Sequence, residues 1–193
     1  MKFFSLENPI WKFIGNLADL CCLPVVTAGA ATTALYYVTL KMARGQEGQL
    51  IPAFFHSFKQ NLKQATALWV GYLAVGILLV LDLVICLQTS SVFAGAMFFT
   101  SVVLLACWAL FITMLFPLVA RCDNTIGALF KMGIAMALRN VMPVLAALMV
   151  TVAFFAVGVF VFWPVLLVAP GLASYCNAFL FNRIFDKYGM TLE

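Results

Sequence analysis

Charged side chains are scarce in this sequence. They make up 9% of the 193 residues, while hydrophobic residues make up 65%, and soluble domains carry roughly 25% charged residues. No Asp, Glu, Lys, Arg or His occurs between Leu83 and Ala120 or between Asn140 and Asn182. A helix needs about 20 apolar residues to cross a bilayer core, so each stretch is long enough for two passes. This composition excludes a soluble globular domain.

Motifs that would indicate catalysis or metal binding are also missing. There is no GxxxxGK[ST] sequence, which argues against a P-loop nucleotide site. The one histidine, His56, has no second histidine or cysteine cluster at metal-ligand spacing, and no nucleophile with an orienting acid. The six cysteines form no CxxC pair and predict no disulfide framework. We therefore expect no catalytic residues, no metal, no cofactor and no enzymatic activity.

The apolar runs predict an all-α, polytopic integral membrane helix bundle forming one domain over residues 1–193. We expect about five transmembrane helices and short amphipathic interfacial helices, because backbone polar groups in lipid must be bonded within each helix. The expected spans cover residues 12–42, 66–88, 93–120, 141–162 and 164–185. Glu7 and Asp19 interrupt the first apolar stretch, so we expect it to belong to the mature protein and not to a signal peptide.

Lysine and arginine residues cluster in the connections 41–65 and 121–140 and in the C-terminal tail. The positive-inside rule places these three segments in the cytoplasm. The net charge of +4 is modest, and it indicates membrane orientation rather than nucleic-acid binding. We therefore expect a multi-pass protein of the cell (plasma) membrane whose first partner is the lipid bilayer.

The first expected span is long for one pass and contains Pro24, which kinks or breaks a helix. Two arrangements are open. We favour one long kinked helix. In the alternative, a re-entrant hairpin, residues 10–24 enter the membrane, Thr27 to Gly29 turn, and residues 30–43 return.

Three polar residues lie inside the expected spans. Asp19 and Asp82 are both about six or seven residues from the outer face if the N-terminus is outside, so a shared outward-facing cavity is one interpretation. The other is that Asp82 reaches the polar turn at residues 88–91 and Asp19 bonds to a neighbouring helix. Asn177 is expected to bond between helices, with pore lining as its alternative role.

The segment Ala53–Ala65 has the pattern of an amphipathic helix. Phe54, Phe55 and Phe58 form an apolar stripe, and Lys59 and Lys63 lie on the other face at i, i+4. Like charges at that spacing slightly disfavour an isolated helix, which indicates a stabilising contact outside the helix. The bilayer interface is one such contact. A protein partner docked on this surface is the other.

Three stretches of the chain, residues 23–37, 44–48 and 54–66, have a distinctive pattern. The motif residues that we single out are Pro24, Thr27, Gly29, Thr32, Thr33 and Tyr36. With these stretches, residues 15–70 resemble the YesL-like bacterial membrane proteins. The resemblance implies a small membrane protein of unassigned function, of a family whose genes in Gram-positive bacteria often lie beside carbohydrate-uptake genes. It supplies no catalytic residues.

Two functions remain in competition. The first is an accessory or interaction subunit of a bacterial transport system, carbohydrate-related, with components of an ABC-type carbohydrate transporter as partners. The second is a small stand-alone transporter or channel with a polar path lined by Asp19 and Asp82.

Overall fold

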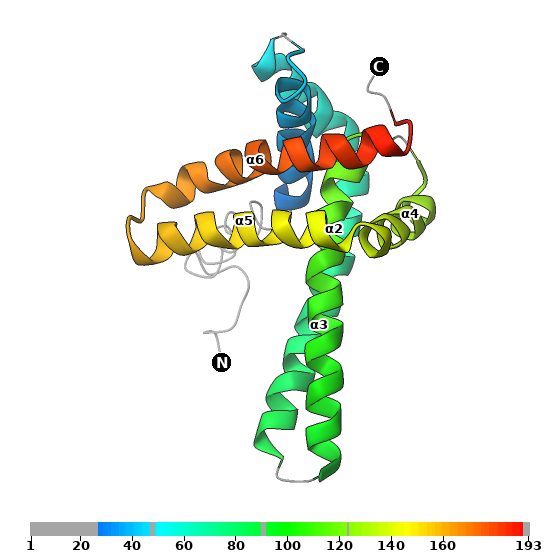
Figure 1. Cartoon of the computed structure of the whole chain (residues 1–193), viewed down its shortest axis with the longest axis vertical. Helices are drawn as coiled ribbons and strands as arrows, with labels where there is room; N and C mark the ends of the chain where they lie inside the picture. Colours follow the sequence, from blue (N-terminus) through cyan, green and yellow to red (C-terminus); the bar gives the residue numbers. More distant parts are fainter. Residues whose placement is uncertain (1–26, 47–48, 90–91, 123, 191–193) are drawn as a thin grey trace, which may run out of the picture.

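The computed structural model describes residues 27–46, 49–89, 92–122 and 124–190, and the regular structure of these residues is entirely helical. A helix over residues 27–42, coloured blue in Figure 1, precedes five labelled helices. These are α2 (Leu50–Gln88), α3 (Val92–Val119), α4 (Ile126–Arg139), α5 (Val141–Phe160) and α6 (Val165–Lys187). The predicted all-α helix bundle is confirmed.

Four of these helices, α2, α3, α5 and α6, are long and apolar enough to cross a membrane. They correspond to the last four expected spans. Of the first expected span, the structure describes only residues 27–42, which are helical. The re-entrant alternative needs a turn at Thr27 to Gly29, but these residues already belong to the helix. Pro24 and Asp19 lie outside the described residues.

Helix α2 differs from the expected arrangement. The amphipathic segment Ala53–Ala65 does not form a separate short helix, because it continues without a break into the apolar span. The first glycine of α2 is Gly71 and its single proline, Pro52, lies in the first turn, so nothing between them interrupts the helix. Its 39 residues extend about 58 Å at 1.5 Å per residue, whereas a hydrocarbon core is about 30 Å thick. In the connection between α3 and α5, by contrast, a short helix, α4, is separate from the spans.

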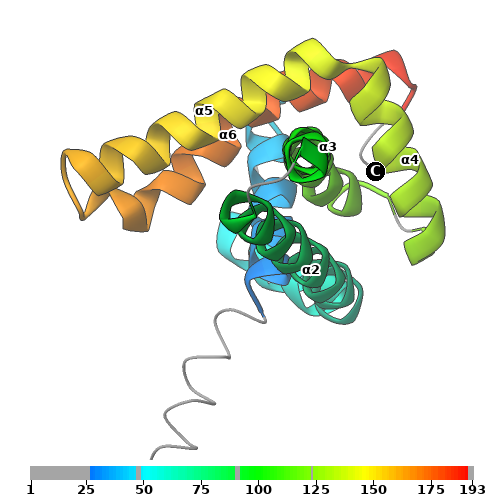
Figure 2. The ribbon, with the colours of Figure 1, turned by 90° about the horizontal axis from the view of Figure 1, so that it is seen from below.

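The helices form two hairpins, α2–α3 and α5–α6, that lie crosswise (Figures 1 and 2). Helix 27–42 lies against α2, and glycine permits the contact: a Cβ on Gly29 would lie 2.5 Å from the Trp69 Cβ and 2.8 Å from the Ala65 carbonyl oxygen. Gly76 of α2 has the same role toward Trp108 of α3. The small residues near position 29 therefore serve close helix packing, as their spacing predicts.

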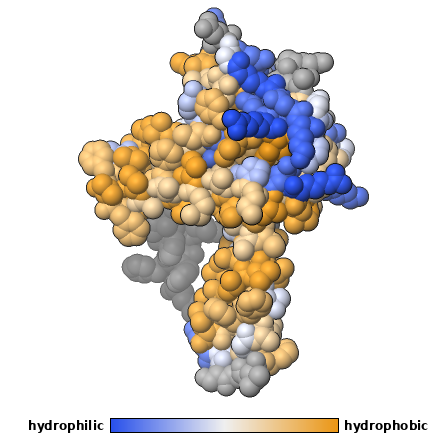
Figure 3. Space-filling model, viewed as in Figure 1, coloured by the Kyte–Doolittle hydropathy of each residue, from blue (hydrophilic) through white to orange (hydrophobic). Residues whose placement is uncertain are grey.

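Polar and apolar surfaces are separated along the molecule. Figure 3 shows hydrophilic side chains gathered around the end of α6, and hydrophobic side chains over the α2–α3 hairpin and the outer half of the α5–α6 hairpin. Large apolar side chains remain exposed on these hairpins, including Ile85 at 62% and Leu167 at 83%. Such a surface suits a lipid environment.

Candidate functional site

The polar end of the bundle is held together by two arginines and two residues of α6, which we call the arginine cluster (Arg44, Arg121, Asn182 and Asp186). Arg44 Nε and Arg121 Nη1 both donate to Asn182 Oδ1, each over 3.0 Å. Asn182 Nδ2 donates to the Leu40 carbonyl over 3.1 Å. Arg44 forms an ion pair with Asp186, and Arg121 Nη2 lies 3.9 Å from the same carboxylate. The segment after helix 27–42, the segment after α3 and the end of α6 thus meet at one end of the bundle.

Arg121 is the buried member of this cluster. Its side chain has 0% relative exposure, and it lies over the ring of Phe185 with 4.9 Å from Cζ to the ring centroid. Burial lowers the pKa of Arg121 from its ordinary value, the positive charge of Arg44 lowers it further, and Asp186 opposes both. The guanidinium also donates to the Met190 carbonyl, which fixes the C-terminal segment across the end of α3. The cluster therefore joins helices and presents no nucleophile.

Asn177 is fully buried between helices. Its Nδ2 donates to the Ala147 carbonyl over 3.1 Å and lies 2.9 Å from Thr151 Oγ1, both on α5. The same amide faces the phenol of Tyr36 from helix 27–42. These contacts give Asn177 a place between three helices, which is the arrangement expected for polar bonding inside a bundle.

Asp19 and Asp82 were expected at one level of the membrane, and Asp19 lies outside the described residues. Asp82 is partly buried on α2, and the hydroxyl of Ser101 on α3 donates to its carboxylate. Asp82 thus has a hydrogen-bond partner across the hairpin. A carboxyl group within an apolar helix is stabilised by such a partner.

The N-terminal half of α2 shows which face of the amphipathic segment is available. Ser57, Asn61 and Ala65 are buried against the bundle, while Phe55 is 55% exposed. Lys59 and Lys63 are exposed as well.

Within the predicted aromatic stripe, the three rings have different environments. Phe54 contacts Phe55 edge to face and stacks on Phe58. Phe58 is partly buried and packs against the core. The surface left for an outside partner therefore centres on Phe55, Lys59 and Lys63.

The remaining motif residues of the resemblance have structural contacts. Thr32 and Thr33 each donate to the carbonyl four residues earlier, over 2.8 Å and 2.9 Å. The ring of Tyr36 meets Phe181 of α6 edge to face. Thr27 begins the described part of the helix. Tyr36 thus packs helix 27–42 against α6, whereas the threonine hydrogen bonds stay within the helix.

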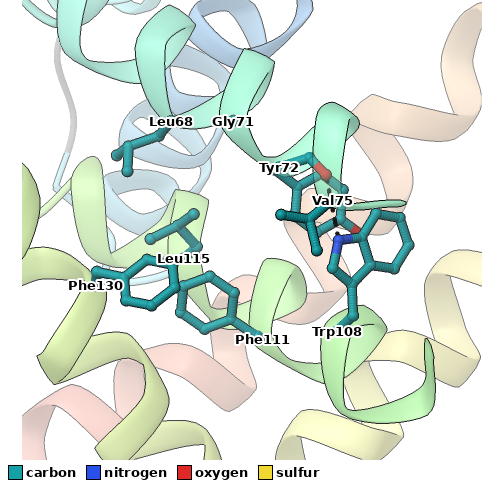
Figure 4. Close-up of a pocket in the computed structure, with 8 residues that line it drawn as sticks. All are labelled: Leu68, Gly71, Tyr72, Val75, Trp108, Phe111, Leu115 and Phe130. Carbon is teal, nitrogen blue, oxygen red and sulfur yellow. Dashed lines mark hydrogen bonds between the residues drawn. The ribbon is translucent and has the colours of Figure 1, made fainter. Parts of the chain in front are cut away.

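An apolar cavity of about 90 Å³ lies between α2, α3 and α4 (Figure 4). Its lining includes Tyr72 and Trp108, whose rings stack at 3.9 Å, and Trp108 Nε1 donates to the Tyr72 carbonyl over 3.2 Å. Phe130 of α4 lines one side. The sequence interpretation missed this cavity. Tyr72 and Trp108 lie 36 positions apart, and nothing in the sequence pairs them.

Among the described residues, no group of three or more His, Cys, Asp or Glu side chains is placed to hold a metal ion. His56 is exposed near the start of α2. The structure brings polar side chains together in the arginine cluster, in the Asn177 contacts and in the Asp82–Ser101 pair, and Asn140 Nδ2 also donates to the Tyr188 hydroxyl over 3.1 Å.

A family model described as "Protein of unknown function, DUF624" matches residues 4–83. This range contains the whole of the stretch, 15–70, on which the resemblance rests. No curated protein and no solved structure matches the chain.

Proposed function

We propose that this chain is an interaction subunit of a plasma-membrane transport system and not an enzyme. The observation that carries the proposal is the length of α2. The helix extends well beyond the thickness of a hydrocarbon core, and its first turns present Phe55, Lys59 and Lys63 outward. Exposed aromatic residues are enriched at protein interfaces, and the two exposed lysines beside Phe55 can attract an acidic partner.

The side of the membrane on which the docking surface (Phe55, Lys59 and Lys63) is expected supports a cytoplasmic partner. The arginine cluster joins the connection after helix 27–42, the connection after α3, and the end of α6. These are the three basic segments that the positive-inside rule assigns to the cytoplasm. The docking surface follows Arg44 by fewer than 20 residues. A partner with an acidic face on the cytoplasmic side, such as the ATPase or permease of an ABC-type transporter, has the complementary charge.

The substrate class rests on the resemblance to YesL-like proteins, whose genes often accompany carbohydrate uptake. That resemblance makes a carbohydrate transporter of a Gram-positive bacterium the first system to test. The alternative, a stand-alone transporter, requires a polar path lined by Asp19 and Asp82, and the contact seen at Asp82 is a hydrogen bond from Ser101.

The test is gentle purification of the tagged full-length chain, followed by mass spectrometry and by transport assays in liposomes. The proposal expects a named transporter component to co-purify, and Lys59→Glu with Lys63→Glu to abolish its recovery. Arg183→Glu with Lys187→Glu is the matched control, because it reverses two exposed charges at the same i, i+4 spacing on α6. Solute movement by the pure chain alone, with no transporter component recovered, would overturn the proposal.

A further inference from the structure

Helix α4 has a buried face and two exposed stripes. The buried face packs on the bundle through Leu129, Gly133, Met136 and Ala137. The first exposed stripe is apolar and consists of Ile126, Phe130, Ile134 and Leu138, with exposed fractions of 46%, 47%, 39% and 66%. The second stripe lies beside it and carries Lys131 and Arg139, both exposed. Residues four apart lie on one line of a helix, so each stripe is continuous.

This pattern fits a helix at the boundary between acyl chains and headgroups. Such helices place an apolar stripe toward the acyl chains and basic residues toward anionic headgroups. Helix α4 connects α3 and α5, two helices that are apolar enough to span a membrane, and it begins five residues after Arg121. It contains no acidic residue. The charge on its outer face is therefore complementary to an anionic lipid surface.

The apolar cavity adds a specific place for a hydrocarbon chain. Phe130 belongs to the apolar stripe and also lines the cavity, and Figure 4 shows it across from Leu68 and Gly71 of α2. Gly71 is exposed, and a Cβ there would meet nothing within 4 Å. An apolar cavity of this kind does not favour water and accepts apolar groups. Lys131 follows Phe130 on α4 and is exposed, so its cation lies on the stripe next to the one that lines the cavity.

We propose that α4 and this cavity form a binding site for an anionic phospholipid of the bilayer. The acyl chain enters the cavity beside Phe130 and Trp108, and Lys131 binds the headgroup. Arg139, two turns further along the same stripe, adds to the positive field. Each basic residue near an anionic membrane surface contributes about a fivefold gain in affinity. The site does not depend on the proposed role in transport.

The test uses Trp108 as an internal reporter. In full-length protein with Trp11, Trp69 and Trp163 replaced by Phe, Trp108 fluorescence is measured in phosphatidylcholine bilayers. Phosphatidylglycerol or phosphatidylcholine with brominated acyl chains is then added as quencher. We expect brominated phosphatidylglycerol to quench Trp108 at a mole fraction at least about fivefold lower than brominated phosphatidylcholine needs. Lys131→Gln should remove most of that preference, and Arg183→Gln with Lys187→Gln, the matched control on α6, should retain it.

A second variant tests the cavity separately. Gly71→Leu leaves every charge in place and directs a side chain into the open space, so it should weaken quenching of Trp108 by brominated phosphatidylglycerol. Native mass spectrometry of the chain with all four tryptophans, with and without Lys131→Gln, gives the same headgroup comparison without the tryptophan changes. Three results would overturn the proposal: equal quenching by the two lipids, a preference that Lys131→Gln does not reduce, or quenching that Gly71→Leu does not change.

Discussion

Arg44 and Asp186 lie 142 positions apart in the chain and form an ion pair that joins the end of helix 27–42 to the end of α6. Asp186 is 59% exposed, so solvent screens the pair. In a double-mutant cycle of Arg44→Gln and Asp186→Asn, we expect a coupling of about 0.5–1 kcal/mol in the free energy of unfolding. Thermal unfolding in detergent measures it. The exposed Lys187→Gln serves as control, and zero coupling would show that the pair adds no stability.

Replacing Asn177 should lower the free energy of unfolding more than breaking the Arg44–Asp186 pair, because Asn177 is fully buried. Asn177→Ala removes its contacts with Ala147 and Thr151 on α5. Hydrogen bonds between membrane helices contribute about 0.6 kcal/mol each on average, so we expect a loss of about 1–2 kcal/mol in stability. The midpoint of thermal unfolding is the readout. A normal midpoint together with altered solute movement in liposomes would instead make Asn177 a pore residue.

Gly29 tests the close approach of helix 27–42 to α2. Gly29→Ala places a methyl group against the Trp69 Cβ and the Ala65 carbonyl, neither of which can rotate away. We expect destabilisation of about 1–3 kcal/mol, typical of overpacking. Gly71→Ala is the control, because it has open space around it and gains helix propensity of about 1 kcal/mol. An equal change in the free energy of unfolding for the two variants would contradict the packing role of Gly29.

Asp82 and Ser101 test the polar contact inside the α2–α3 hairpin. We expect Asp82→Ala and Ser101→Ala each to lower stability by about 1 kcal/mol, and the double variant to lose less than the sum. Unfolding of all three variants in the same detergent supplies the comparison. Additive losses would mean that the two side chains do not act together. Unchanged stability with lost solute movement would favour the polar-path alternative.

The helix ranges could be predicted from hydropathy because each run of apolar residues is bounded by a polar or proline-containing turn. Helices α3, α5 and α6 begin and end within two residues of the ranges 93–120, 141–162 and 164–185. The start of α2 was missed because its amphipathic and apolar parts share one helical period with no break between them. Hydropathy therefore marks where α2 becomes apolar but not where the helix begins.

The contacts between helices were harder to predict. From the sequence, Arg121 belongs to a basic segment that predicts membrane orientation, and Asp186 has no predicted role. The reason is that the residues around each of them do not indicate which distant residue it contacts. The cavity beside Trp108 depends on the relative placement of three helices, which hydropathy does not encode. In contrast, the packing role of Gly29 follows from its small neighbours alone, and the close contact with Trp69 agrees with it.

The most direct test of the proposed interaction role is site-specific photocrosslinking in living cells. A photoreactive amino acid is placed at position 55, which is 55% exposed on the docking surface, and at Val80, which is 49% exposed in the apolar half of the same helix. The account predicts a discrete crosslink from position 55 to a transporter component, absent at position 80 and lost with Lys59→Glu and Lys63→Glu. Crosslinking of position 55 to lipid alone, with no protein adduct, would contradict it.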